Sequence, residues 1–304
     1  MKFSQRIGKT PLTKEIQLES IDPELKNGLW NIYTLNILKP IADVVRAEKT
    51  NLYGYYDTSG NDFCVALWHY HFKKNVDTIP PKFWEVESSI KTHFFSYKWY
   101  EIYDFLEFNM ELVRQNMLEI PEEDLLERFH YILGKFNEVL ETEFAGYRFI
   151  DGILSPITNA TEMQEIETSL STTENFTPLK NCNIHLKDAL DKLSNKNNPD
   201  YRNSIKEAIS AVECIAKIIS GGAKDSLGEA LKKINTKIKI HPSLVAGFGK
   251  IYGYTSDEGG IRHSLTDETE PCDFEDAKFM LVSCSAFINY LVVKADKVGI
   301  DIKN

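Results

Sequence analysis

The sequence of 304 residues lacks a surplus of positive charge, because 35 lysine and arginine residues stand against 45 aspartate and glutamate residues. A chain with a net charge of −10 has no general electrostatic attraction for nucleic acids, whose backbones are bound through many lysine and arginine contacts. If such a chain binds RNA, we expect a transient substrate held by a local positive patch. The hydrophobic content of 42% is that of an ordinary soluble globular protein.

Cysteine motifs and a leader segment are also lacking. The sequence has five scattered cysteines, Cys64, Cys182, Cys214, Cys272 and Cys284. None forms a CxxC pair or a zinc-finger spacing, which favours reduced thiols and a cytoplasmic location. No apolar stretch of signal-peptide length opens the chain. The most apolar segment, residues 277–295, contains Lys278 and Asn289, so we predict a buried helix and no membrane span.

Tryptophan is lacking from the second half, since all four tryptophans lie between Trp30 and Trp99. This shift in composition predicts two cores of different character. We predict a first domain over residues 1–158, a linker rich in Thr, Ser, Glu and Asn over 159–181, and a second domain over 182–304. Part of the linker, around residues 163–170, has the pattern of a short helix.

Both domains are predicted to be mainly α-helical. In the first, Asp22 and Pro23 have the residue types of a helix N-cap and first helical position. The segment YRFIDGILSPI, with Asp151-Gly152 at its centre, predicts a short β-hairpin. In the second, two long and several shorter helical patterns with short connections predict a helical bundle.

The helix predicted at 199–220 has two distinct faces. Its apolar positions recur at helical spacing: Ile205, Ile209, Val212, Ala216 and Ile219. A polar stripe runs beside them: Arg202, Lys206, Ser210, Glu213 and Lys217. The last helix is apolar nearly all round, more than one bundle core requires, and we therefore expect a homodimer.

Two short motifs are interpreted conservatively. Gly8–Thr10 reads GKT, but Phe3 stands where a phosphate-binding loop needs its first glycine. His69 and His71 would share one side of a strand, a pair that could bind a metal, but no third ligand is near in the sequence. We interpret these histidines as packing residues and predict no metal and no cofactor.

The adjacent Arg262 and His263 follow a loop that contains Gly259 and Gly260. Histidine exchanges protons near neutral pH, and arginine can brace a phosphate with a planar fork of donors. Together they suffice for metal-free RNA cleavage, with the histidine as acid or base and the arginine stabilising the charge on phosphorus. A nearby basic patch could hold an RNA backbone; its residues are Lys232, Lys233, Lys237 and Lys239.

A structural interpretation of the same pair stays open. Asp257 and Glu258 could pair with Arg262, while His263 could cap a helix. The residue types alone do not establish the geometry of a catalytic site.

The wider pattern resembles a known family. The blocks FSQRIGKTPLTKEIQLESID, LWN, WYEIYDFLEF and EFAGYRFIDGILSPI resemble the type 4 N-terminal domain of AbiJ-like abortive-infection proteins. The blocks NPDYRNSIKEAISAVE, YGYTSDEGGIRHSL and DAKFMLVSCSAFINYL are similar to the helical HEPN-type domain that follows it in those proteins.

The resemblance implies an anti-phage protein whose second domain dimerises and acts as a metal-independent endoribonuclease. In HEPN domains an arginine, a polar residue and a later histidine meet across the dimer. Arg202 and Asn203 match the start of that pattern, but no histidine follows four to six residues on. The implied catalytic set is therefore His263 and Arg262, with Arg202 and Glu213 beside them on the polar stripe. The alternative is an inactive relative that binds RNA or nucleotide, or senses a phage-derived trigger.

Overall fold

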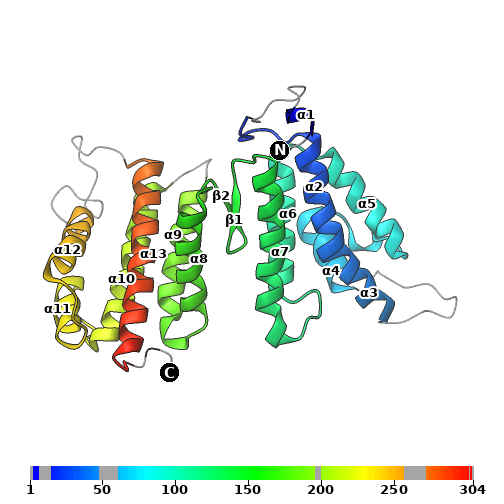
Figure 1. Cartoon of the computed structure of the whole chain (residues 1–304). Helices are drawn as coiled ribbons and strands as arrows, with labels where there is room; N and C mark the ends of the chain where they lie inside the picture. Colours follow the sequence, from blue (N-terminus) through cyan, green and yellow to red (C-terminus); the bar gives the residue numbers. More distant parts are fainter. Residues whose placement is uncertain are drawn as a thin grey trace. The chain divides into compact units, whose positions relative to one another are not determined.

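The structure of the chain is a computed structural model that describes residues 3–6, 15–47, 61–195, 200–256, 272–300 and 302. It confirms the predicted fold class, mainly α-helical with one small sheet (Figure 1). The chain forms two compact units, Met1–Pro156 and Ile157–Asn304.

The first unit contains seven α-helices among its described residues, a small sheet, and short π- and 3₁₀-helical turns. In chain order they are α1 (Phe3–Arg6), α2 (Pro23–Tyr33), η1 (Thr34–Leu38), α3 (Lys39–Ala47), α4 (Asp62–Ala66), η2 (Leu67–His71), η3 (Val76–Thr78), α5 (Phe83–Ser96), α6 (Trp99–Arg114), α7 (Glu122–Thr142), β1 (Arg148–Ile150) and β2 (Ile153–Ser155). The N-cap predicted at Asp22 is confirmed, because its side chain accepts a hydrogen bond of 2.8 Å from the Leu25 amide.

Aromatic side chains fill the core of the first unit. Phe105 is fully buried at its centre. Its ring lies 4.9 Å from that of Tyr33, 5.3 Å from that of His71 and 5.7 Å from that of Phe94, measured between centroids. The Tyr33 hydroxyl donates a hydrogen bond of 3.1 Å to Oδ1 of the buried Asn109. This cluster joins α2, η2, α5 and α6 into one hydrophobic core.

The predicted β-hairpin is confirmed, and its turn is anchored to α6. Asp151 and Gly152 adopt positive φ angles of 49° and 89°, the conformation of a two-residue turn that favours glycine. Nη2 of Arg114 lies 2.7 Å from both the carbonyl oxygen and Oδ1 of Asp151. The Arg114 guanidinium also lies over the ring of Phe129, 4.4 Å from its centroid.

Side chains from two helices form hydrogen bonds with backbone groups on the outer edges of this sheet. The amide of Asn137 on α7 donates to the Phe149 carbonyl (2.9 Å) and accepts from the Phe149 amide (2.8 Å). On the other edge, Glu107 of α6 accepts from the Leu154 amide at 2.6 Å. Both strands therefore have side-chain partners where a further strand would otherwise pair.

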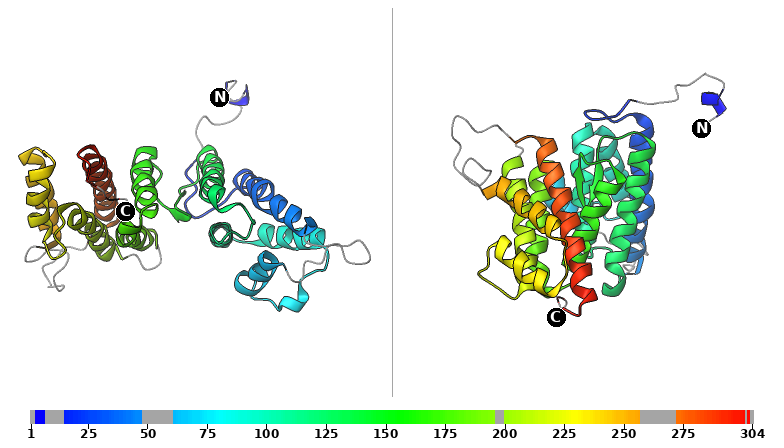
Figure 2. Two further views of the ribbon diagram at one scale, coloured as in Figure 1. Left: turned by 90° about the horizontal axis from the view of Figure 1, so that it is seen from below. Right: turned by 60° about the vertical axis from the view of Figure 1, so that its left-hand side comes forward.

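The second unit is helical throughout its described residues. Its elements are α8 (Ala160–Glu174), η4 (Thr177–Leu179), α9 (Lys180–Ser194), α10 (Tyr201–Ser220), α11 (Leu227–Lys237), α12 (Pro242–Ser256) and α13 (Phe274–Lys297). Helix α10 packs against α9, α11 and α13, and the two views of Figure 2 show these helices running side by side. The predicted apolar face of α10 is buried as expected.

Helix α8 lies within the segment that the sequence predicts as a linker. Asn159 caps its first turn by accepting from the amides of Thr161 and Glu162. Ile166 and Leu170 are buried against the rest of the second unit. The segment is thus an integral helix of the bundle, longer than the short helix that its composition indicates.

Helix α13 is long and apolar enough to span a membrane by length and composition alone. Within the second unit it packs against α8, α9 and α10, and fully buried positions such as Leu281, Ser285 and Leu291 face these neighbours. This is the packing of a core helix, in agreement with the interpretation of residues 277–295 as a buried helix.

Candidate functional site

The predicted polar stripe of α10 lies along the partly exposed side of the helix. Arg202, Ser210, Glu213 and Lys217 are half-buried and Lys206 is exposed. Arg202 is the second residue of α10, and Glu213 follows eleven residues later on nearly the same face. A rise of 1.5 Å per residue separates their backbones by about 16 Å. The two residues therefore cannot contact one phosphate from a single chain.

Glu213 instead belongs to a local ion pair. Its Oε2 lies 3.8 Å from Nζ of Lys217, one turn further along α10. Such a pair between partly exposed side chains at i,i+4 contributes only about 0.3–0.5 kcal/mol. The other carboxylate oxygen, Oε1, is buried, so the Glu213 side chain lies only partly at the surface of α10.

Arg262 and His263 lie outside the described residues, as do Gly8–Thr10. The two helices that flank the Arg262-His263 segment are described. The ring of Tyr201, at the start of α10, lies 6.3 Å from that of Phe274, at the start of α13. The N-terminal ends of α10 and α13 are therefore neighbours, and the chain re-enters α13 beside the turn of α10 that carries Arg202.

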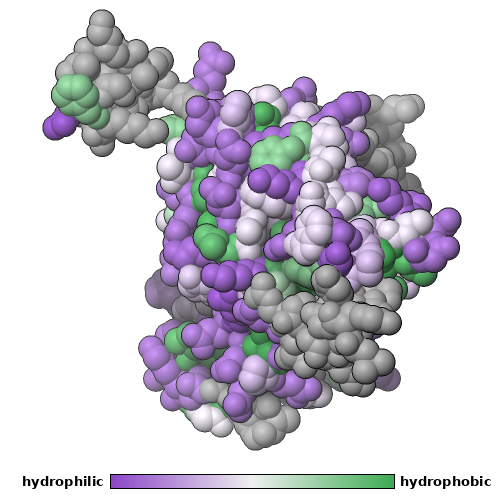
Figure 3. All heavy atoms as spheres, turned by 90° about the vertical axis from the view of Figure 1, so that its right-hand side faces the viewer, coloured by the Kyte–Doolittle hydropathy of each residue, from purple (hydrophilic) through white to green (hydrophobic). Residues whose placement is uncertain are grey.

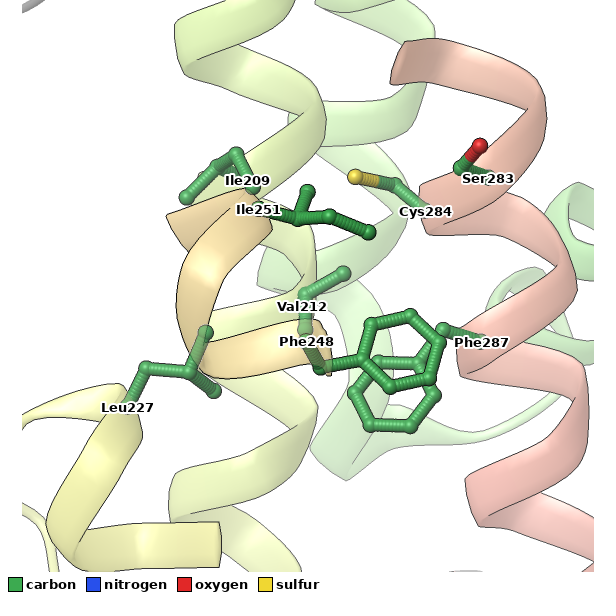
Figure 4. Close-up of a pocket in the computed structure, with 8 residues that line it drawn as sticks. All are labelled: Ile209, Val212, Leu227, Phe248, Ile251, Ser283, Cys284 and Phe287. Carbon is green, nitrogen blue, oxygen red and sulfur yellow. The ribbon is translucent and has the colours of Figure 1, made fainter. Parts of the chain in front are cut away.

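Helix α12, which precedes the segment, runs antiparallel to α10. Figure 4 shows Ile251 beside Ile209, and Phe248 beside Val212 and Phe287, around a small apolar pocket. The rings of Phe248 and Phe287 are stacked. Because residue numbers rise along α12 as they fall along α10, α12 ends toward the same end of the bundle where α10 begins. The Cys284 thiol in this pocket is buried, which raises its pKa to about 12 and keeps it protonated.

The predicted RNA-binding lysines lie on and just after α11, at the opposite end of α10. All four are exposed: Lys232, Lys233, Lys237 and Lys239. Nζ of Lys233 lies 2.7 Å from Asp225, and Nζ of Lys237 donates to the carbonyl of Ser220, the last residue of α10, at 3.4 Å. These two lysines thus stabilise the connection between α10 and α11, and the patch is far from Arg202.

A histidine–carboxylate pair on the second unit is a feature that the sequence does not reveal. Nδ1 of His185 on α9 lies 2.7 Å from Oε2 of Glu207 on α10, and Nζ of Lys206 lies 3.9 Å from the other carboxylate oxygen. A carboxylate oxygen only accepts, so Nδ1 carries the hydrogen. The two residues are 22 apart in the sequence, and only the packing of α9 on α10 brings them together.

The prediction of a strand that contains His69 and His71 is wrong. Residues Leu67–His71 form the π-helical turn η2, closed by a hydrogen bond of 2.9 Å from the Phe72 amide to the Leu67 carbonyl. The helical turn directs His69 into solvent and His71 against the aromatic core, so the two rings do not share a face. In the described part of the chain, no group of three metal-ligating side chains is found.

Some aromatic residues of the first unit are largely exposed. Trp84 and Tyr70 are 63% and 59% exposed. On the face shown in Figure 3, hydrophobic residues lie in separate small areas between hydrophilic ones. This face has the mixed character of an ordinary protein surface.

His71 makes the first unit sensitive to acid. Burial, then the neighbouring His93 and Lys73, lowers its pKa to about 4, and its Nε2 lies 3.3 Å from the Tyr97 hydroxyl. Unfolded histidine binds its proton near pH 6.5. The stabilising contribution is therefore complete above about pH 6.5 and is lost as the pH falls toward about 4. We expect a loss on the order of 1–2 kcal/mol after solvent screening of the partly exposed ring is allowed for.

The measurement is urea unfolding at several values between about pH 7 and about pH 4.5. His71→Gln should flatten the dependence relative to the wild type, whereas the exposed His69→Gln should leave it unchanged. Equal slopes for the wild type and His71→Gln would contradict the assignment.

The comparisons with known proteins give one match. The sequence profile of the family described as AbiJ N-terminal domain 4 matches residues 1–172. No curated protein and no solved structure matches the chain significantly. The matched range covers the whole first unit and nearly all of α8. Because the match spans more than half of the 304 residues, the chain belongs to the AbiJ N-terminal domain 4 family of abortive-infection proteins.

Proposed function

We propose that this chain is an anti-phage protein of bacteria whose second unit is a HEPN-like, metal-independent endoribonuclease that acts on RNA in the cytoplasm as a homodimer. In this proposal His263 transfers the proton and Arg262 stabilises the charge that develops on the phosphate. A phage-derived trigger activates the protein. The family membership supports the defence role, and the helical fold of the second unit is compatible with the HEPN resemblance.

The observation that carries the proposal is the meeting of helix ends at one end of the bundle. The contact between Tyr201 and Phe274 brings the start of α13 to the start of α10, next to Arg202. Five residues stand between Ser256, the last residue of α12, and Arg262, and the six steps from Ser256 to Arg262 span at most about 20 Å when fully extended. Arg202 is therefore the described cation best situated to assist Arg262 and His263, and Glu213 is too far along α10.

Dimerisation is supported by the outer side of α13. Phe279 and Val293, about four helical turns apart on nearly the same side of α13, are 60% and 53% exposed. Large apolar side chains exposed along one helix are typical of a surface that meets another subunit. The proposal therefore expects a dimer in solution, measured by light scattering.

RNA cleavage by the purified full-length chain in EDTA tests the proposal. We expect His263→Ala to lower the cleavage rate at least 100-fold, since a general acid or base contributes about 10²–10⁴-fold. Arg202→Ala should lower it by about tenfold or more through the loss of a phosphate contact. His130→Ala removes an exposed histidine of the first unit and is the matched control. Absence of cleavage by the wild type under infection-like conditions would falsify the nuclease assignment.

A second candidate function is an inactive relative that binds RNA or nucleotide for regulation. It is favoured by the spread of the positive side chains, since Arg202 and the α11 lysines lie near opposite ends of α10. An extended charged path suits binding of a strand better than catalysis at one phosphate. This function predicts RNA binding that Lys232→Ala and Lys239→Ala weaken, without any cleavage that depends on His263.

A further inference from the structure

Helix α12 differs from the other α-helices of the second unit in how little of it is buried. No residue between 242 and 253 is buried, whereas α8, α9, α10, α11 and α13 each contain four or more buried residues. Most of the stability of a helix within a protein comes from the packing of its apolar face. Helix α12 therefore gains less stability from its neighbours than the rest of the bundle does.

Two glycines weaken α12 further. Gly247 and Gly249 are both exposed in the interior of the helix, and neither has a positive φ angle. A Cβ atom at either position would meet no other atom within 4 Å, so no close approach of another segment requires a glycine there. A glycine inside a helix shifts the helix equilibrium against folding by about fivefold relative to alanine. The sequence therefore destabilises α12 without a compensating contact.

The surface beneath α12 is, in contrast, almost completely buried. The pocket under the helix has apolar walls on α10, α11 and α13, and five of its residues are each 2% exposed: Ile209, Val212, Leu227, Cys284 and Phe287. On the side of α12 the half-buried Phe248 and Ile251, one turn apart, close the pocket (Figure 4). A weakly stabilised helix thus covers a well-buried apolar surface.

The contacts that α12 loses on opening are separate from those that hold the bundle together. Opening breaks the stack of Phe248 on Phe287 and exposes Ile251. The packing of α10 on α9 and α13, and of α13 on α8, does not involve α12. Segments with few buried apolar contacts open locally at a free energy well below that of global unfolding. Helix α12 can therefore unfold while the other helices stay packed.

We propose that α12 is a lid that opens by local unfolding, so that the second unit has a closed state and an open state. The open state presents the apolar walls on α10 and α13 to solvent. An effector that binds one state better than the other shifts the balance between them. The proposal concerns the second unit alone and does not depend on RNA cleavage.

The Cys284 thiol reports the opening, because it lies in the pocket beneath α12. The experiment is labelling of the full-length native chain with N-ethylmaleimide, followed for each cysteine by peptide mass spectrometry. Cys182 is the internal reference for unfolding of the whole unit, since it is 0% exposed and its thiol lies 3.4 Å from the Ala211 carbonyl of α10. We expect Cys284 to react about tenfold faster than Cys182, or more.

Substitutions in α12 should change the labelling of Cys284 alone. Gly247→Ala and Gly249→Ala should each slow it by about fivefold, because a more stable helix opens less often. Phe248→Ala should speed it by about tenfold or more, because the stack on Phe287 and the burial of the ring are lost. The rate at Cys182 should stay the same in all three variants.

Gly228→Ala is the matched control. It makes the same change at an exposed position of α11, where a Cβ atom also meets nothing within 4 Å. The Cys284 rate should then change by less than about twofold. Equal rates for Cys284 and Cys182 in the wild type, or a Cys284 rate that Gly247→Ala and Gly249→Ala leave unchanged, overturn the proposal. Equal slowing by Gly228→Ala also contradicts it, because α11 would then open together with α12.

Discussion

A fragment of residues 182–304 is expected not to fold cooperatively, whereas a fragment of residues 157–304 is expected to fold. The shorter fragment begins at the predicted domain boundary and lacks α8. Loss of α8 removes Ile166 and Leu170 from the core of the second unit, at about 1.5–3 kcal/mol each. It also leaves the side-chain amide of the buried Asn183 without its acceptors, the Leu170 carbonyl at 2.9 Å and the Thr173 hydroxyl at 3.0 Å.

Together these losses amount to about 5 kcal/mol or more, which is comparable with the whole stability of a domain of this size. Circular dichroism and urea unfolding of the two fragments measure the difference. A cooperative transition of similar midpoint for both fragments would show that α8 is dispensable and that the boundary lies after it.

Phe105→Ala is expected to destabilise the first unit by about 3–5 kcal/mol, the range for removal of a fully buried phenylalanine. The ring is the common neighbour of Tyr33, Phe94 and Tyr97, so its loss creates a cavity and also removes edge-to-face contacts with Tyr33 and Phe94. The helices around it cannot close the cavity without moving α6 against α2.

The matched control for this substitution is Tyr70→Ala in the first unit, where the side chain is 59% exposed. A change within about 0.5 kcal/mol is expected there. Urea unfolding followed by tryptophan fluorescence suits the measurement, since all four tryptophans lie in the first unit. Similar losses for the two variants would contradict the central position given to Phe105.

Local features of the fold could be predicted because their signals lie within a few residues. The cap at Asp22, the turn at Asp151-Gly152 and the apolar face of α10 each depend on adjacent positions or on one helical period. The full length of α8 is not evident from its sequence, because serine, threonine and glutamate are abundant in it. Its burial depends on α9 and α13, which are distant in the sequence. The short aromatic run around His69 and His71 fits the spacing of a strand as well as that of a helix. In the structure it forms a helical turn that buries Trp68 in the core.

The candidate sites depend on tertiary contacts, so the sequence alone predicts them less well than it predicts the local features. The sequence singles out Arg202 and Glu213 as members of one stripe, but the stripe is too long to be one site. His185 and Glu207 meet only because α9 packs on α10.

The covered edges of the hairpin limit how the first unit can recognise another protein. Peptides and partner proteins often dock by adding a strand to an open sheet, which requires unpaired backbone groups. Here Asn137 holds both outward backbone groups of Phe149, and Glu107 holds the outward amide of Leu154. β-augmentation is thus blocked at both borders of the sheet. A viral protein sensed by this unit would therefore have to bind to helix surfaces and side chains.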